Sequence, residues 1–387
     1  MMTTVTDLAA AHEELAHVTR KALATAAPEE AVDWDLVVRS GWVGLEAPSS
    51  VDGADATFAE VAVVLREWGR AAALGPYPSV TLAVAALVGT GLDRPLSRAI
   101  DGHSTPIVVL SAAGDGPSQL ELGADGDATL TGSTTFVPDA DRADLLLVPA
   151  RTPDGEIVLV TVDPNATGVS IRTKPVVDAT RDLADISLDG VHVTRGQVAR
   201  WGSDGGTAID RLRDRAALSI ACDSVGLADA MLDATVTYAG VREQFGRKIG
   251  SFQAVKHACA DMLVQVSVAR RLVQAAIDAV VSDDPAAPIA VSKAASFADE
   301  AAVSVCGKAV QLHGGIGYTW ESGLHVYLKR ATLNRSLYGS PAWHRARIAE
   351  RYRDAEPPNP IANPRRAAAT GTPTPSVALG TPAPSAE

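Results

Sequence analysis

Apolar residues recur at intervals of three and four along the first hundred positions of the chain. Two sets of them would each fall on one face of a helix: Leu8, Leu15 and Val18, and then Phe58, Val61, Leu65 and Trp68. This interval is close to the helical repeat of 3.6 residues. The pattern therefore predicts a helical domain over residues 1–104.

The period changes between about residues 105 and 200. Short β-branched runs, separated by Gly, Asp and Pro turns, read IVVL, DLLLVPA, EIVLVTV and ISLDGVHV. Runs of this length and composition are typical of strands bounded by turns. We expect residues 105–200 to form a compact β domain.

Long segments rich in Ala, Val and Leu follow between residues 201 and 353. Turn signals interrupt them between Val241 and Gly250, between Ser282 and Pro288, and from Gly314 to Tyr318, which indicates four helices. Residues 354–387 are rich in Pro, Ala and Thr and can bury little apolar surface, so we expect a disordered tail. The chain is predicted to be mainly α with a central β domain.

Composition narrows the possible functions. A formal net charge of −12 argues against a nucleic-acid partner, because phosphate binding needs clustered Lys and Arg. The sequence contains no apolar run long enough for a membrane span and no signal-peptide core, so we expect a cytoplasmic protein. Cys222, Cys259 and Cys306 lie far apart in apolar segments, where we expect them to pack. No cluster has metal-ligand spacing, and we expect no metal site.

Two segments of the last domain contain residues suited to a dinucleotide. They read TYAGVREQFGRKIGSFQAVKHACADM from Thr237 and QLHGGIGYTWESGLHVYLKRA from Gln311. The Arg242 guanidinium is a fork of donors that fits a pyrophosphate, and Phe245 offers a flat apolar face beside it. Each residue alone is also compatible with an ordinary ion pair or core packing. Their combination favours a ligand.

Further residues of these segments support the same interpretation. Gln253 and Gln311 have amides that can bind ribose or adenine edges, while Gly314 and Gly315 let a ligand approach the backbone. The run Gly-Gly-Ile-Gly is not a Rossmann fingerprint, because it follows a helix and has no βαβ context. His313 has no nucleophile motif near it in sequence, so we expect it to pack rather than to catalyse.

The two segments closely resemble the signature stretches of acyl-CoA dehydrogenases, and the resemblance extends from about residue 7 to residue 353. It implies a helical N-terminal domain, a β-barrel-like middle domain, a C-terminal four-helix bundle and an FAD cofactor. In that family the matching residues bind the ADP portion of an FAD whose flavin ring belongs to the adjoining subunit. Carried over to this chain, the cofactor-binding residues are Arg242, Phe245, Gln253, Gln311, Gly314 and Gly315.

The resemblance also indicates that a catalytic base is missing. α,β-Dehydrogenation of an acyl thioester needs a base for the α-proton, and the family supplies a Glu from one of two positions. Tyr338 and Ala216 stand at these positions here, so we expect no catalytic residue in this chain. Asp214 and Asp223 are the nearest acids on either side of Ala216, but neither shares both its azimuth and its depth along a helix.

The residues that would lie beside the flavin ring also differ from those of active family members. Active relatives have a TEP…GSD loop, where this chain reads VVLSAAGDGPSQLELGADG. They also have a strand Thr that donates a hydrogen bond to the flavin, and Pro138, in the run Phe136-Val-Pro, cannot do so. Ser340 and Ala342 replace the Thr and Gln with which relatives hold their own FAD.

This pattern resembles the degraded subunit of actinobacterial heterotetrameric acyl-CoA dehydrogenases. The resemblance implies an α2β2 complex with a catalytic subunit, a bulky acyl-CoA substrate, steroid or branched, and an electron-transfer acceptor. Two alternatives remain open at this stage. The chain could be a self-sufficient homo-oligomeric dehydrogenase with an unrecognised base such as Asp214 or Asp223, or a scaffold with no redox role.

Overall fold

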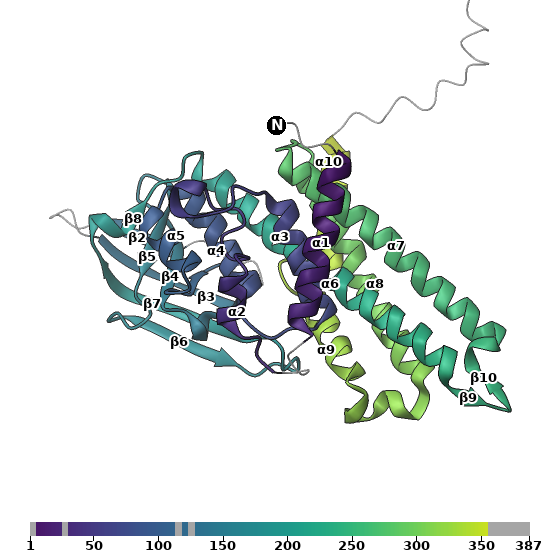
Figure 1. The fold of residues 1–387 in the computed structure, drawn as a ribbon. Coiled ribbons are helices and arrows are strands. Elements are labelled where there is room, and N and C mark those ends of the chain that lie inside the picture. Colours follow the sequence, from purple (N-terminus) through teal and green to yellow (C-terminus); the bar gives the residue numbers. More distant parts are fainter. Residues whose placement is uncertain (1–4, 25–29, 113–117, 123–127, 355–387) are drawn as a thin grey trace, which may run out of the picture.

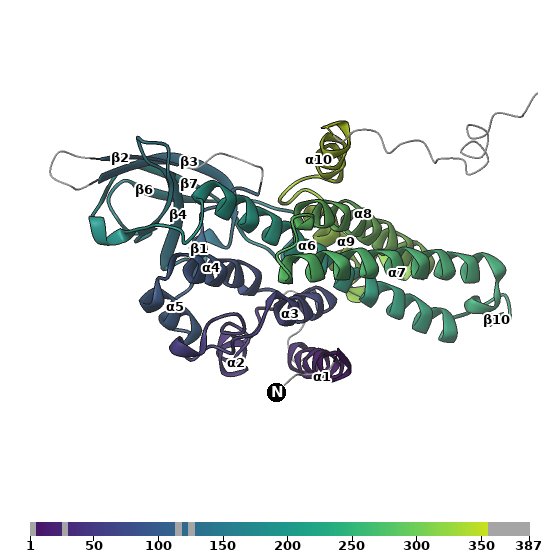
Figure 2. The same ribbon diagram turned by 90° about the horizontal axis from the view of Figure 1, so that it is seen from above.

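The computed structural model describes residues 5–24, 30–112, 118–122 and 128–354, so the predicted tail lies outside the described residues except for its first position. Figures 1 and 2 show a curved β sheet at one end of the molecule and a long helical bundle at the other. The helices of the N-terminal third lie along one side of both.

Five α-helices precede the sheet: α1 (Val5–Leu23), α2 (Trp34–Arg39), α3 (Phe58–Arg70), α4 (Tyr77–Thr90) and α5 (Asp93–Ile100). A capping box begins α3, because the Glu60 side chain accepts a 2.8 Å hydrogen bond from the backbone N–H of Thr57. Arg20 joins α1 to α3 through two 2.8 Å hydrogen bonds to the buried carboxylate of Glu67.

The middle of the chain supplies eight strands: β1 (Pro106–Val108), β2 (Ser118–Leu122), β3 (Ala128–Pro138), β4 (Leu145–Arg151), β5 (Ile157–Val162), β6 (Val169–Lys174), β7 (Leu183–Val193) and β8 (Val198–Ala199). They form one sheet in the order β6-β7-β3-β2-β4-β5-β8, with β1 paired to β4. Most neighbours are antiparallel, whereas β1 and β2 each pair with β4 in parallel.

The C-terminal part consists of α6 (Gly205–Val241), α7 (Gln253–Val281), α8 (Ala287–His313), α9 (Leu324–Asn334) and α10 (Pro341–Asp354). Three of the four predicted helices are therefore continuous, while the fourth is divided into α9 and α10. The break contains Tyr338 (φ 54°) and Gly339 (φ 114°), both outside helical geometry, and Pro341 begins the next helix.

Helix α6 is the centre of the molecule. It packs against α3 and α4 of the N-terminal third and against α7, α8 and α9 of its own bundle. A Cβ on Gly226 would lie 2.0 Å from the carbonyl oxygen of Arg66, and one on Gly69 would lie 2.1 Å from that of Asp223. The backbones of α3 and α6 thus touch, and only glycine fits at either contact.

These elements confirm the predicted fold class, a mainly helical chain with a central β region. Helices, strands and further helices also follow one another in the predicted order. The domain limits at residues 104, 200 and 353 stay a prediction.

The glycine contact leads to a first testable prediction. Gly226→Ala should destabilise the protein by about 3 kcal/mol or more, because a methyl group has no room against the α3 backbone. Gly240→Ala is the matched control, since Gly240 lies on the exposed end of α6 with nothing within 4 Å of its Cβ position. The control should be neutral or stabilising by about 0.5–1 kcal/mol. Denaturant unfolding of both variants measures the difference, and equal losses would contradict the tight crossing.

Candidate functional site

The end of α6 leads into a two-stranded hairpin, β9 (Glu243–Gln244) and β10 (Arg247–Lys248). Its turn consists of Phe245 (φ 54°) and Gly246 (φ 73°), and Phe245 is 93% exposed. A left-handed backbone is costly for a bulky residue, and an exposed ring gains nothing from burial. Its ring lies edge-to-face with Phe252, with centroids 6.2 Å apart, but most of its surface stays open, which is typical of a residue in a contact surface.

Arg242 and Gln253 flank this hairpin. Arg242 is the C-cap residue of α6, and its carbonyl oxygen accepts a 2.8 Å hydrogen bond from the backbone N–H of Ile249, which closes the base of the hairpin. Gln253 is the first residue of α7. Both the Arg242 and the Gln253 side chains are exposed, so their donors and acceptors are available to a ligand.

The other predicted residues follow the end of α8. Gln311 is exposed on its last turn, and Gly314 (φ 62°) begins a short 3₁₀ turn that runs to Tyr318. Gly314 and Gly315 are exposed, and a Cβ on either would meet no atom within 4 Å. The backbone is therefore open on this side.

The structure gathers these six residues at one end of the helical bundle, the end that carries β9 and β10 in Figure 1. We call this surface the tip: Arg242, Phe245, Gln253, Gln311, Gly314 and Gly315. The base position at Ala216 is not part of it, because Arg242 lies about 40 Å further along α6 at 1.5 Å per residue. The tip and this base position therefore belong to different sites.

Both base positions are occupied by residues without an available carboxylate. Ala216 is 3% exposed in the main apolar core. Tyr338 donates its backbone N–H to the carbonyl oxygen of Ala112 (2.9 Å), and its ring packs against a cluster that includes Leu183 and Ile220. Burial raises the pKa of the Tyr338 hydroxyl, so near neutral pH its ionised, proton-accepting form is even less populated than that of an exposed tyrosine.

Asp214, two residues before Ala216 on α6, is held in an ion pair. Asp214 forms a two-pronged ion pair with Arg347 of α10, and one contact measures 3.0 Å. Burial raises the pKa of Asp214, and the Arg347 guanidinium opposes that rise. The pair connects α6 to α10, the helix that follows the Tyr338 break.

Asp223 is part of a buried ionic cluster between the bundle, the sheet and α3. Arg330 donates to both of its carboxylate oxygens, at 3.0 and 2.5 Å, and Asn334 donates to one at 2.7 Å. The Nη2 atom of Arg181 lies 3.2 Å from the same carboxylate. Burial alone would raise the pKa of Asp223, but Arg330 and Arg181 hold it below its ordinary value. Removing a proton from substrate would break these contacts.

Two acids that the sequence analysis did not single out border this cluster. Asp299 of α8 is buried and accepts a 2.7 Å hydrogen bond from Ser224, and burial raises its pKa to about 8. Asp139, at the end of β3, accepts a 2.5 Å hydrogen bond from Ser79, and burial raises its pKa to about 6. Asp299 stands between Ala295, Ala298 and Ala302 in sequence, and an acid on such an apolar face is a signal for a buried carboxyl.

On the sheet, the residues that replace the flavin-ring strand are part of β3. The pairing of β3 with β7 shifts between Thr134 and Val137, where Phe136 adopts φ 54° in a β-bulge. Pro138 pairs opposite Leu183. The stretch 108–126, which stands where the family has TEP…GSD, lies partly outside the described residues, which omit 113–117 and 123–127.

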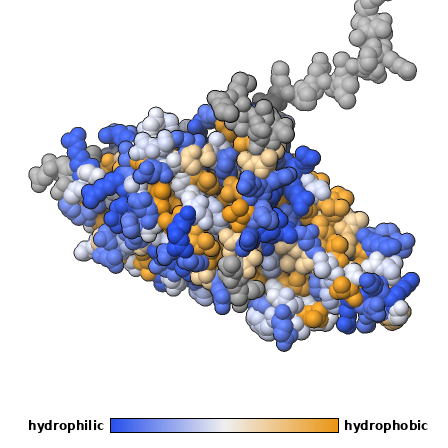
Figure 3. Space-filling view, viewed as in Figure 1, coloured by the Kyte–Doolittle hydropathy of each residue, from blue (hydrophilic) through white to orange (hydrophobic). Residues whose placement is uncertain are grey.

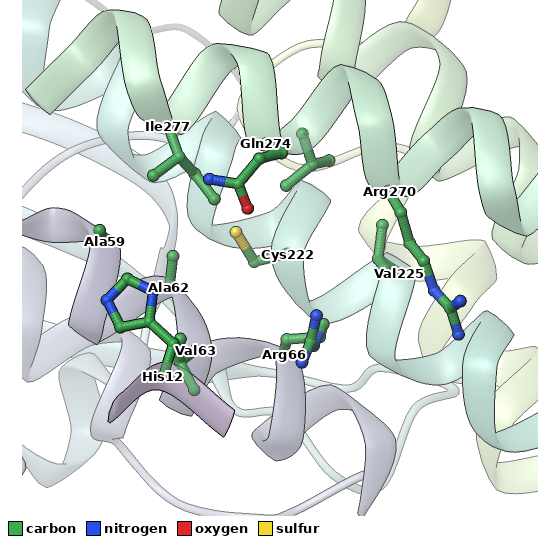
Figure 4. A pocket seen from close by; sticks show the side chains of 11 residues that line it. His12, Ala59, Ala62, Val63, Arg66, Cys222, Val225, Arg270, Gln274 and Ile277 are labelled. Carbon is green, nitrogen blue, oxygen red and sulfur yellow. The ribbon is translucent and has the colours of Figure 1, made fainter. Parts of the chain in front are cut away.

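A small cavity lies between α1, α3, α6 and α7 (Figure 4). It encloses about 50 Å³, close to the volume of one or two water molecules. Its wall includes the Cys222 thiol, whose pKa burial raises to about 12. Its polar rim includes His12, bonded to Glu60, and Arg270, paired with Asp229. None of the predicted site residues lines it, and it is too small for a cofactor.

Two searches of the described residues were negative. Within residues 5–24, 30–112, 118–122 and 128–354, no helix combines the length and apolar character that a membrane crossing requires. In the same ranges, no group of three or more His, Cys, Asp or Glu residues is arranged to hold a metal ion.

Comparison with known proteins places this geometry in context. Residues 204–353 match the family profile described as "Acyl-CoA dehydrogenase, C-terminal domain". Over 311 residues the chain is 36% identical to acyl-CoA dehydrogenase IpdE2 of Mycolicibacterium smegmatis, an alignment that covers 80% of this chain and 84% of the relative.

Solved structures give the same result for the fold. The crystal structure of the ChsE4-ChsE5 complex from Mycobacterium tuberculosis contains a chain with a TM-score of 0.81 and 28% identity, covering 92% of this chain and 100% of that one. A variant of the Tcur3481-Tcur3483 steroid ACAD contains a chain with a TM-score of 0.77 and 26% identity, covering 89% and 98%.

The buried carboxyl of Asp299 generates a prediction about pH. Its folded-state pKa of about 8 lies above the ordinary 3.8, so the folded protein holds this proton more tightly and loses stability as pH rises from about 4 to 8. Asp299→Asn mimics the protonated form and keeps the acceptor for Ser224. We expect the variant to exceed wild type only slightly at pH 5 and to unfold at a temperature several degrees higher at pH 8.

Thermal unfolding at both pH values tests this expectation. Asp189→Asn is the control, because Asp189 is an exposed residue of β7, and it should shift unfolding little at either pH. An Asp299→Asn variant that is less stable than wild type at pH 8 would show that the charged carboxylate is required.

Proposed function

Because the chain belongs to the acyl-CoA dehydrogenase family, we propose that it is the subunit of a hetero-oligomeric enzyme that contributes ADP-side FAD contacts to a catalytic partner subunit. The reaction of the family is the α,β-dehydrogenation of an acyl-CoA thioester. The observation that carries the proposal is the contrast between an exposed, dinucleotide-compatible tip and the two positions expected for a base, which hold the buried Ala216 and the half-buried Tyr338. The chain thus has the surface for the ADP end of FAD and lacks the carboxylate that would remove the α-proton.

The residues of the tip fit the ADP end of FAD, the cofactor of this family. Arg242 would bind the pyrophosphate, the ring of Phe245 would cover an apolar face of the ligand, and the amides of Gln253 and Gln311 would bind ribose or adenine edges. Gly314 and Gly315 leave the backbone open, since no atom lies within 4 Å of either Cβ position. When bound, FAD supplies the acceptor for the hydride that leaves the β-carbon.

The partner must then supply the base. Of the nearest acids on either side of Ala216 in sequence, Asp214 is paired with Arg347 and Asp223 with Arg330 and Arg181. The two guanidiniums hold the pKa of Asp223 below its ordinary value, which makes it a poor proton acceptor, and Asp214, whose pKa burial raises, would have to give up its pair with Arg347 to take up a proton. The buried contacts of both acids therefore support the proposal against a self-sufficient dehydrogenase.

Exposed apolar residues near the tip support a partner surface. Ile316 is 49% exposed, Tyr318 81% and Trp320 74%, all in the turns that follow the tip glycines. Leu263 and Val264 of α7 are 50% and 62% exposed, and Figure 3 shows hydrophobic side chains over this helix. Apolar groups gathered in this way favour protein contact over solvent.

The subunit composition, substrate and electron acceptor of this proposal are based on similarity to relatives. The ChsE4-ChsE5 structure is a complex, and the Tcur3481-Tcur3483 protein is a steroid ACAD. By similarity, we propose an α2β2 complex that acts on a bulky acyl-CoA, a steroid side chain or a branched chain, and passes electrons to an electron-transfer acceptor.

Flavin content tests the subunit role. We expect the chain purified alone to be colourless, and its complex with a co-expressed catalytic subunit to hold one FAD per two chains by visible absorbance. Arg242→Ala should lower FAD retention in the complex at least tenfold, because a charged bidentate contact is lost. Arg195→Ala, an exposed arginine beside the sheet, is the matched control and should retain FAD.

Other outcomes of this experiment identify the alternatives. One FAD per chain in the protein alone, with acyl-CoA oxidation, would establish a self-sufficient homo-oligomer. No flavin in any assembly would establish a scaffold without a redox role.

A separate substitution tests the location of the base. Asp214→Asn should leave turnover of the mixed complex within about twofold of wild type, because the proton is removed in the partner. Steady-state kcat at several pH values measures this. A loss of a hundredfold or more with an unchanged melting temperature would identify Asp214 as the base and contradict the proposal.

A further inference from the structure

The tip is assembled from two helix ends that are distant in sequence. Arg242 and Phe245 follow α6, whereas Gln311 and Gly314 belong to the end of α8. A single ligand can contact both groups only if the two helix ends keep a fixed position relative to each other, and misplacement by about 1 Å is enough to weaken a polar site. A contact between the two ends would fix that relative position.

Tyr238 and His313 make such a contact. Their rings stack with centroids 4.3 Å apart and planes 20° apart, and the Tyr238 hydroxyl donates a long 3.4 Å hydrogen bond to the carbonyl oxygen of His313. The His313 carbonyl is one of the last of α8, where helical partners are lacking. One side chain of α6 thus binds both the ring and the backbone of the residue that ends α8.

Each partner is also tied to its own half of the tip. The Tyr238 carbonyl oxygen accepts the backbone N–H of Arg242 at 2.9 Å, and His313 directly precedes Gly314. His313 Nδ1 lies 2.8 Å from the carbonyl oxygen of Ala309. Because a carbonyl can only accept, Nδ1 must donate its proton there, and this bond fixes the orientation of the ring.

We infer that Tyr238 and His313 are positioning residues that hold the two halves of the tip in register. The inference rests on the proposed function for what the tip binds, but the register itself is a property of this chain. Deeper side chains such as Leu232 and Val310 join α6 to α8 in the core. Tyr238 and His313 are only half-buried, at the last turn of each helix, where they align the ends.

Hydrogen exchange on the full chain tests the register directly. Tyr238→Leu should speed exchange about tenfold at the Ile249 amide and in the turn from Gly314 to Tyr318, with the bundle core unchanged. Tyr238→Phe and His313→Phe keep two stacked rings and should stay close to wild type. Tyr352→Leu, an exposed tyrosine on α10, is the control. Unchanged exchange in Tyr238→Leu, or equal acceleration throughout the bundle, would overturn the inference.

FAD retention by the mixed complex is the second readout. We expect Tyr238→Leu to release FAD about tenfold faster than wild type, and both phenylalanine variants to restore retention. If Arg242→Ala loses FAD but Tyr238→Leu keeps it, the positioning role fails and the proposed function stands. If neither substitution affects FAD, the proposed function fails, and the exchange result alone decides whether the pair sets the register.

Discussion

The buried ion pair between Asp223 and Arg330 holds together parts of the molecule that would otherwise be separate. Arg330 of α9 donates to Asp223 of α6 and also to the carbonyl oxygen of Ala73, which follows α3, and to the hydroxyl of Thr180, which precedes β7. One guanidinium therefore connects the bundle, the N-terminal helices and the sheet. Breaking such a pair by removing one partner leaves a charge buried, which typically costs about 3–5 kcal/mol.

The same cluster places several charged groups in the interior of the protein. The cluster contains two guanidiniums, of Arg181 and Arg330, near four buried carboxyls: Asp139, Asp178, Asp223 and Asp299. Burial raises the pKa of Asp139 to about 6 and that of Asp299 to about 8, so both carry protons below about pH 6, where the two remaining carboxylates balance the two guanidiniums. The acids in this region thus serve electrostatic balance between the layers.

Local patterns in the sequence were sufficient for the fold class and for the exposed tip. Helical periodicity, β-branched runs and turn residues are short-range properties, and they identified the order of helices and strands correctly. The tip residues lie in two continuous segments, so their presence at one surface follows once α6 and α8 run in the same direction. Whether they bind FAD stays a prediction.

Contacts between residues far apart in the sequence could not be predicted from such local patterns. Asp223 and Arg330 are 107 positions apart, and no local pattern marks them as partners. The importance of Asp139 and Asp299 depends on burial by several elements, and the break at Tyr338 depends on its backbone contact with Ala112 across the sheet. Parallel pairing of β1 and β2 with β4 likewise depends on the whole sheet. These features arise from tertiary packing, which overrides local preference.

The glycine contact between α3 and α6 also bears on the synthesis of the polypeptide. Gly69 and Gly226 meet backbone to backbone, yet at about 5–20 residues per second the ribosome needs roughly 8–30 s to travel from one to the other. During that interval α3 has no α6 to cover it, and residues such as Trp68, 1% exposed in the finished protein, face solvent. The nascent N-terminal third is therefore a natural client for chaperones until the central helix emerges.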